Sequence, residues 1–272
     1  MTLDFRLDDY LKRVGFDRAV KPDLATLAAL HAAHVNAIPF EGLDPLLGRP
    51  VRLDLASVQA KLVQSRRGGY CFEQNALFKA VLETIGFQVE GLGARVRWMS
   101  PPDSPLGPRV HMLLKVDLPE GPYLADVGFG ACLLDAPLRL ETGVEQGTPM
   151  GVYRLNEADG LYALSAKRGA TWRTMYVFNL EPQLPADYAL SNWFTSTSPE
   201  APFVSRLIME RVAGGARHKL IDRRYLIEAR DGDVVAERPL DSANDLGRVL
   251  DETFNVTPPA PMEEVFARIG SR

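Results

Sequence analysis

The 272-residue chain has only two cysteines and four histidines, and it contains no long hydrophobic run. Cys71 and Cys132 are too few and too far apart for a disulfide framework or a zinc knuckle, which predicts a reducing, intracellular setting. No uninterrupted apolar stretch approaches the roughly 20 residues of a membrane span. The acidic, mixed N-terminal sequence does not resemble a signal peptide. We therefore expect a cytoplasmic protein without a membrane partner.

The chain also lacks a strong excess of charge of either sign. Lys and Arg number 31 against 35 Asp and Glu, which leaves a net charge of -4. This balance excludes a general attraction to nucleic acid or to an anionic membrane surface. With 46% hydrophobic residues, the chain can bury the cores of two or three packed units.

The hydrophobic periodicity changes from helical to strand-like near residue 87. Before it, apolar residues recur at three and four positions, with glycine stops at Gly15 and Gly86 and an Asp23 cap. After it, residues 90–98, 110–117 and 123–127 alternate as strands do, and more strands follow in 153–177 with turns at Gly160 and Gly169.

The C-terminal third reads as a linker followed by a mixed unit. Residues 191–203, rich in Ser, Thr and Pro, resemble a linker, and a hairpin is expected around residues 231–233. A final helix is expected near residues 246–254. Helices, then strands, then a mixed tail favour an α+β fold. We assign 1–86 to a helical bundle, 87–190 to a β-barrel-like domain, and 191–272 to a linker and an α/β lid.

Cys71 is the first candidate for chemistry. It follows Gly68 and Gly69, and the helical pattern that ends at Gly86 begins there. Free N–H groups and the helix dipole at such a position stabilise a thiolate, the reactive form of cysteine. The other interpretation is a small buried apolar residue, as expected for Cys132. The adjacent glycines favour a nucleophile.

A cysteine nucleophile needs a base, and the base needs an orienting acceptor. His111 lies on one face of the strand 110–117, and Asp126 lies among apolar residues of the next strand. Pairing of these strands would place the two side by side. A core histidine and a turn-forming aspartate remain open as separate interpretations.

The remaining histidines give no metal site. His31 and His34 lie three apart on a helix, but no third ligand has a compatible spacing, so packing or capping is expected. His218 is interpreted as a surface or strand residue. We therefore expect no metal. The Gly128-Phe129-Gly130 segment lacks the Lys-Ser/Thr ending of a nucleotide-binding loop.

These residues together resemble the arylamine N-acetyltransferases of bacteria along essentially the whole chain. The motifs that carry the resemblance, in order, are Ile38-Pro39-Phe40-Glu41, Arg67-Gly68-Gly69-Tyr70-Cys71-Phe72-Glu73-Gln74-Asn75, His111-Met112-Leu113-Leu114, Asp126-Val127-Gly128-Phe129-Gly130, Asn192-Trp193, Ser196-Thr197-Ser198-Pro199 and Phe203. One departure is Gly42, where many relatives have asparagine; it concerns the support of the site.

The resemblance implies a helical bundle, a β-barrel-like domain and an α/β lid, with a papain- or transglutaminase-like catalytic core. It implies a Cys71–His111–Asp126 triad and a supporting ion pair between Glu41 and Arg67. It also implies an acceptor pocket, whose expected residues are Phe40, Val96, Phe129, Gly130 and Phe203.

The implied reaction is ping-pong transfer of acetyl from acetyl-CoA, through a Cys71 thioester, to arylamines, arylhydrazines or hydrazides. No permanently bound cofactor is expected, and acetyl-CoA is a substrate. The protein is expected to be a monomer or a homodimer. The alternatives are a transglutaminase- or papain-like cysteine hydrolase, an amide synthase of a biosynthetic pathway, and a non-enzymatic binding protein with an unreactive Cys71.

Overall fold

The helices of the N-terminal part begin and end at residues whose chemistry favours a boundary. In the computed structural model, which describes residues 5–101 and 103–270, the first helix stops at Gly15 (φ 67°) and the fifth at Gly86 (φ 108°). The Asp23 side chain caps the second helix by accepting a hydrogen bond from the Thr26 N–H. The helices are α1 (Leu7–Val14), α2 (Leu24–Ala37), α3 (Leu43–Leu46), α4 (Leu55–Gln59), η1 (Ala60–Gln64) and α5 (Cys71–Ile85).

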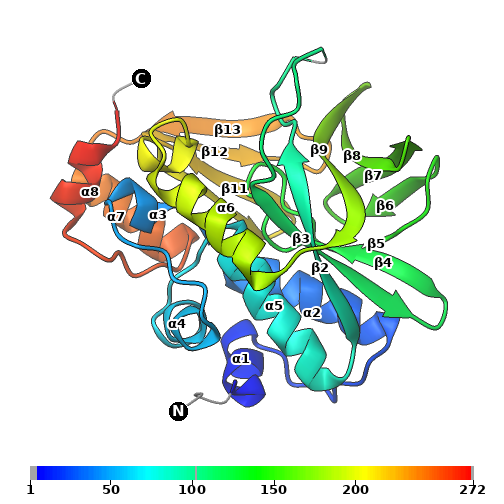
Figure 1. The fold of residues 1–272 in the computed structure, drawn as a ribbon. Coiled ribbons are helices and arrows are strands. Elements are labelled where there is room, and N and C mark those ends of the chain that lie inside the picture. The colour runs from blue at the N-terminus through cyan, green and yellow to red at the C-terminus, as the bar shows by residue number, and fades with distance from the viewer. Residues whose placement is uncertain (1–4, 102, 271–272) are drawn as a thin grey trace.

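Eight antiparallel strands form a curled, barrel-like sheet in the order β5-β4-β3-β2-β9-β8-β7-β6 (Figure 1). The expected turns at Gly160 (φ 76°) and Gly169 (φ 55°) are present, joining β7 to β8 and β8 to β9. The strands are β2 (Gln88–Val96), β3 (His111–Leu118), β4 (Gly121–Ala125), β5 (Leu138–Arg139), β6 (Glu145–Thr148), β7 (Gly151–Ala158), β8 (Leu161–Arg168) and β9 (Thr171–Pro182). The predicted α+β fold with a barrel-like sheet is confirmed.

A second sheet of five strands has the order β1-β10-β11-β12-β13. Its edge strand β1 (Phe40–Glu41) comes from the N-terminal part and pairs with β10, placing Phe40 opposite Glu210. Sequence periodicity did not predict this pairing, because two residues show no pattern. The other elements here are β10 (Ile208–Ala213), β11 (Ala216–Ile221), β12 (Arg224–Glu228), β13 (Val234–Pro239), α7 (Ala243–Arg248), η3 (Val249–Thr253) and α8 (Met262–Arg268).

The segment expected to be a linker is largely helical. Helix α6 (Pro185–Thr197) covers most of it, and the short turn η2 (Pro202–Val204) follows. Helix α6 runs across the front of the molecule between the two sheets (Figure 1). The composition of residues 191–203 indicated a crossing or linker and gave no sign of the helix that the structure shows there. The hydroxyls of Thr195, Ser196 and Thr197 donate to helix carbonyls one turn back, so these residues are compatible with a helix.

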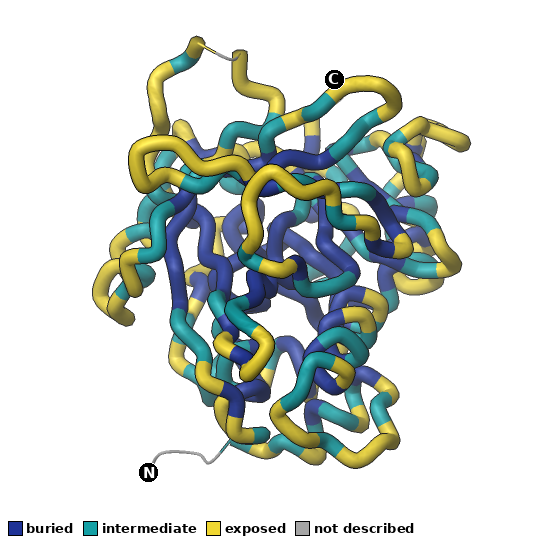
Figure 2. The backbone as a smooth tube through the Cα atoms, turned by 90° about the vertical axis from the view of Figure 1, so that its right-hand side faces the viewer, coloured by how far each residue is buried: buried dark blue, intermediate teal, exposed yellow. Residues whose placement is uncertain are grey.

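Three hydrophobic cores hold these elements together. One lies between the N-terminal helices and strands β3 and β4, one fills the barrel-like sheet, and one packs α7, η3 and α8 against the five-stranded sheet. Buried residues are concentrated in the interior, and exposed residues lie at the periphery, in loops and also on strand β13 (Figure 2). Full burial of each large apolar side chain contributes about 1.5–3 kcal/mol, so all three interfaces are substantial.

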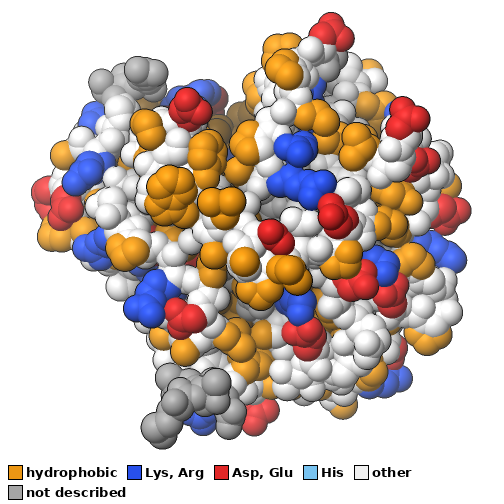
Figure 3. Space-filling view, in the orientation of Figure 1, with side chains coloured by type: hydrophobic (Ala, Val, Ile, Leu, Met, Phe, Trp, Pro, Cys, Tyr) orange, Lys and Arg blue, Asp and Glu red, His pale blue; other side chains and the backbone are white. Residues whose placement is uncertain are grey.

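The surface carries no large single-sign patch on the face shown in Figure 3, where acidic and basic side chains are interspersed. Over residues 5–101 and 103–270, no helix combines the length and apolarity that crossing a membrane requires.

Gly128, three residues after the end of strand β4, lies against helix α5. A Cβ at this position would lie 2.7 Å from Cys71 Cα and 2.7 Å from Asn75 Nδ2. Real Cβ atoms do not tolerate such contacts with backbone, so any side chain here must push the helix and the segment after β4 apart.

We expect Gly128→Ala to lower the thermal midpoint by several degrees, since overpacking costs about 1–3 kcal/mol. It should also reduce the alkylation rate of Cys71, because the strain falls on its own backbone. Gly107→Ala is the matched control, since a Cβ there meets nothing within 4 Å. Thermal unfolding followed by circular dichroism measures the difference, and equal midpoints for both variants would contradict the close approach.

Candidate active site

Cys71 is the first residue of helix α5, as the glycines before it indicated. It is 5% exposed, and its Sγ lies 3.7 Å from the Val110 carbonyl oxygen at the start of β3. The Glu73 side chain accepts a hydrogen bond from the Tyr70 N–H (3.2 Å) just before the helix. The thiol therefore lies between the first-turn N–H groups of α5 and the residue that precedes strand β3.

His111 and Asp126 form the pair that the sequence analysis proposed. His111 Nε2 lies 2.7 Å from Asp126 Oδ2, and both side chains are at most 3% exposed. Cys71 and His111 line the same cavity, and the Cys71 side chain is near enough to the imidazole to raise its pKa. The structure thus brings all three predicted residues together, from α5, β3 and the segment after β4.

The contact does not arise from strand pairing, which was the expected route. Strand β4 ends at Ala125, although the sequence pattern extended it to Val127. The backbone N–H groups of the next two residues bond to side chains and not to a neighbouring strand. The Asp126 N–H donates to His31 Nε2 (3.2 Å), and the Val127 N–H donates to Asn75 Oδ1 (3.1 Å). The backbone leaves the sheet here, and this departure aims the carboxylate at His111.

The Asp126 carboxylate is bonded on both oxygens. Oδ2 accepts from His111 and from the Tyr176 hydroxyl (2.9 Å), while Oδ1 accepts from Asn75 Nδ2 (3.0 Å) and the Gly128 N–H (2.9 Å). Burial raises the pKa of Asp126, but the charge of His111 and the hydrogen bonds from His111, Asn75 and Gly128 outweigh burial and hold it below its usual range. Asp126 is therefore an ionised acceptor.

His111 is held in its protonated form. Burial lowers its pKa, but the charge and hydrogen bond of Asp126, together with Cys71, raise the pKa of His111 to about 10. The site thus holds a protonated imidazole that a carboxylate anchors, in the same cavity as the Cys71 side chain.

The other three histidines are neutral. Burial lowers the pKa of His31 to about 3 and that of His34 to about 4, and it also lowers the pKa of His218. His34 Nε2 donates to Gln74 Oε1 (2.7 Å), because the Gln74 amide nitrogen already donates to the Pro39 and Gly69 carbonyls. His31 and His34 pack and bond as the sequence analysis expected, and His218 lies on strand β11.

Behind the nucleophile lies a buried group of charges. Arg67 bonds to Glu41 Oε1 (2.7 Å) and pairs with Asp44 (3.2 Å), while Lys61 lies 2.7 Å from Glu73. Glu41 Oε2 also accepts the Leu43 N–H (2.8 Å). The expected contact between Glu41 and Arg67 is thus present, and it ties β1 to the residues that precede Cys71.

A cavity of about 410 Å³ opens onto Cys71 and His111. All five residues expected for the acceptor pocket line it: Phe40, Val96, Phe129, Gly130 and Phe203. Gly130 packs directly against the Phe40 ring, and Gly42 against the Phe203 ring, so a larger residue at either position would displace an aromatic wall. The lining is mostly apolar and includes Arg206.

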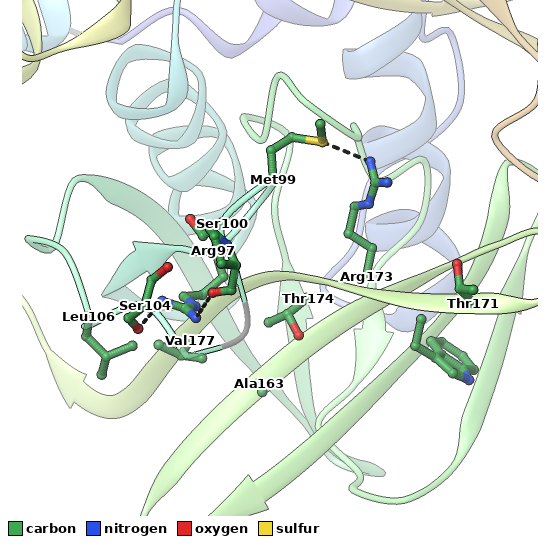
Figure 4. A pocket seen from close by; sticks show the side chains of 12 residues that line it. Arg97, Met99, Ser100, Ser104, Leu106, Ala163, Thr171, Arg173, Thr174 and Val177 are labelled. Carbon is green, nitrogen blue, oxygen red and sulfur yellow. Dashed lines mark hydrogen bonds between the residues drawn. The ribbon is translucent and has the colours of Figure 1, made fainter.

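A second cavity, of about 740 Å³, lies between the β2–β3 loop and strands β8 and β9 (Figure 4). Its wall includes Arg97 and Arg173, and the latter donates to Met99 Sδ (3.0 Å). Met99 lines both cavities, but Cys71 and His111 line only the smaller one. The described residues hold no group of three or more His, Cys, Asp or Glu placed to bind a metal ion.

Three further partners of Asp126, namely Tyr176, Asn75 and His31, were not predicted from the sequence. Asn75 follows Cys71 by one helical turn, so its spacing placed it on the same face of α5. Tyr176 and His31 carried no such signal, because their contacts depend on how the sheet curls and how α2 docks.

The fold and site together define a class of mixed α and β enzymes in which a thiol, an imidazole and a carboxylate share one apolar cavity. A family model described as N-acetyltransferase matches residues 23–260. An arylamine N-acetyltransferase of Mycolicibacterium smegmatis is 44% identical over 224 residues, which cover 81% of this chain and 82% of that protein. The chain belongs to the arylamine N-acetyltransferase family.

Solved structures agree with this assignment. An M. smegmatis arylamine N-acetyl transferase has a TM-score of 0.93 at 38% identity, covering 99% of this chain and 100% of that one. The arylamine N-acetyltransferase of Mycobacterium marinum in complex with CoA has a TM-score of 0.92 at 38% identity, covering 97% and 98% of the two chains.

The raised pKa of His111 predicts how stability changes with pH. The pKa of His111 is about 10 in the folded protein, against an ordinary value of 6.5. Protonated His111 therefore contributes to the free energy of unfolding; this contribution is complete below pH 6.5 and is lost as pH rises towards 10. Urea unfolding of wild type and His111→Gln isolates this contribution, because other titrating groups cancel. We expect the difference in free energy of unfolding to shrink between pH 6 and pH 10. A difference that grows over this range would contradict the ion pair.

Proposed function

We propose that the protein transfers acetyl from acetyl-CoA, through a thioester on Cys71, to the nitrogen of aromatic amines, arylhydrazines or hydrazides. The observation that carries the proposal is the placement of Cys71 beside the bonded pair of His111 and Asp126 at an aromatic-lined cavity. Family membership supports the reaction class, and the M. marinum structure with CoA supports the donor.

In the first half-reaction, the Cys71 thiolate attacks the acetyl carbonyl of the donor. The tetrahedral intermediate collapses by breaking the bond between the acetyl carbon and the CoA sulfur. His111 gives its proton to the departing thiolate, so that CoA leaves as the thiol and His111 becomes neutral. The first-turn N–H groups of α5 are suited to stabilise the oxyanion of this intermediate.

In the second half-reaction, the amine nitrogen attacks the Cys71 thioester, and His111 accepts the proton that this nitrogen loses. Cys71 is one cause of the raised pKa of His111. Acetylation of Cys71 removes this cause, so the pKa of His111 falls and its neutral form becomes more populated. Release of the amide restores the thiolate–imidazolium pair. Asp126 orients the imidazole throughout and remains ionised.

The cavity accounts for the acceptor class. Phe40, Phe129 and Phe203 present ring surfaces to a flat aromatic amine, and Val96 completes the apolar wall. Such a lining also excludes water, which would hydrolyse the thioester. Glu41 and Arg67 act indirectly, because their ion pair holds β1 and the approach to Cys71 in place.

Intact-protein mass spectrometry after treatment with acetyl-CoA alone tests the thioester. We expect the wild type to gain one acetyl group and to lose it when an aniline or an arylhydrazine is added. Cys71→Ser should gain none, because serine has no thiolate to pair with His111. Cys132→Ser is the matched control and should behave as wild type, since Cys132 lies in the core of the barrel-like sheet.

Two outcomes would contradict this function. Full amine acetylation by Cys71→Ser would exclude a Cys71 thioester. Loss of the acetyl group to water at the same rate with and without amine would instead indicate a cysteine hydrolase.

A further inference from the structure

Residues 126–137 follow strand β4 as a mostly buried segment outside the sheets and helices. Among the described residues, the one backbone–backbone hydrogen bond within it runs from the Cys132 N–H to the Phe129 carbonyl (3.0 Å). Buried backbone groups need partners. Side chains from other elements bond to the backbone of Asp126, Val127, Ala131 and Leu133, so those side chains help to decide where this segment lies.

The two halves of the segment are held by different parts of the molecule. The first half, which carries Asp126 and Gly128, bonds to His31 of α2, to Asn75 of α5 and to Tyr176 of β9. These bonds come from the surroundings of Cys71. They account for the triad geometry and do not reach the residues after Phe129.

The second half is held by β10 and β11 of the five-stranded sheet. Glu210 Oε1 accepts the Leu133 N–H (2.8 Å), Arg217 donates to the Leu133 carbonyl (3.1 Å), and Lys219 Nζ donates to the Ala131 carbonyl (2.9 Å). Glu210 and Arg217 are fully buried, and Lys219 is 6% exposed.

These three charged residues compensate one another. Arg217 Nε lies 3.5 Å from Glu210 Oε1, and Lys219 Nζ lies 3.6 Å from Glu210 Oε2 and 2.8 Å from Glu228. Buried charges are costly, and well-packed apolar residues often replace them without loss of stability. What apolar residues cannot provide here is the set of hydrogen bonds to the Leu133 and Ala131 backbone.

The held residues border the acceptor cavity directly. Phe129, Gly130 and Ala131 form one of its walls, and Gly130 packs against the Phe40 ring on the other side. A shift of Leu133 or Ala131 therefore moves this wall towards or away from Phe40. The triad is bonded separately and does not have to move with it.

We propose that Glu210, Arg217 and Lys219 are positioning residues for the amine acceptor: by bonding the Ala131 and Leu133 backbone, they set the position of the cavity wall formed by residues 129–131. This role rests on the proposed acetyl transfer. It assigns part of the control of amine affinity to a sheet that contributes none of the three triad residues.

Steady-state kinetics of Glu210→Met and Glu210→Gln with an arylamine test the proposal. Methionine has a similar size but cannot accept the Leu133 N–H, so we expect the amine KM to rise roughly tenfold, as for the loss of one hydrogen bond to a charged group. Glutamine keeps the acceptor oxygen, and its amine KM should stay within about twofold of wild type. The rate of iodoacetamide alkylation of Cys71 should stay within about twofold in both variants.

Glu237→Met is the matched control. Glu237, on β13 of the same sheet, pairs with Arg224 on β12 and makes no bond to residues 126–137. Its amine KM should equal that of wild type. If Glu210→Met does not fold, Lys219→Met carries the same prediction, because it removes the bond to the Ala131 carbonyl.

An unchanged amine KM in Glu210→Met would overturn the positioning role. So would equal KM values for the methionine and glutamine variants, or a parallel fall in the alkylation of Cys71, which would indicate a general disturbance. These outcomes are distinct from failure of the proposed function, in which the wild type itself would acetylate no amine.

Discussion

The hydrogen bonds to the buried Asp126 carboxylate are the interactions on which the rest of the site depends. Its two oxygens receive donors from α5, β3 and β9, and its own N–H is bonded by α2. A buried carboxylate without such partners would be strongly unfavourable. The same bonds therefore keep Asp126 ionised and His111 protonated, and they also join the N-terminal helices to the barrel-like sheet.

The position of the segment after β4, which forms one wall of the cavity, is also set by hydrogen bonds from other elements. Its first half is fixed by the neighbours of Cys71, and its second half by charged residues of the five-stranded sheet. Strand β1 also links the cavity to the five-stranded sheet, because Phe40 lines the cavity while its strand pairs with β10. The cavity is therefore shaped jointly by parts of the chain that are distant in sequence.

Much of this arrangement could be predicted from sequence, for local physical reasons. The glycines before Cys71 and the stop at Gly86 indicated the nucleophile helix, and alternation placed His111 on a strand. Asp126 was recognised because an acid in an apolar stretch needs a partner. The end of β4 at Ala125, the helix over the Ser/Thr-rich segment and the role of Tyr176 were missed, since each depends on tertiary hydrogen bonds or packing that no periodicity records.

The ion pair between Asp126 and His111 is tested most directly by an NMR titration of the imidazole rings. His31, His34 and His218 are neutral at pH 8, so one charged ring is expected there. We expect His111 to stay protonated up to pH 9 in the wild type, and Asp126→Asn to shift the titration of His111 to lower pH. A wild-type His111 that titrates near 6.5, its ordinary value, would contradict it.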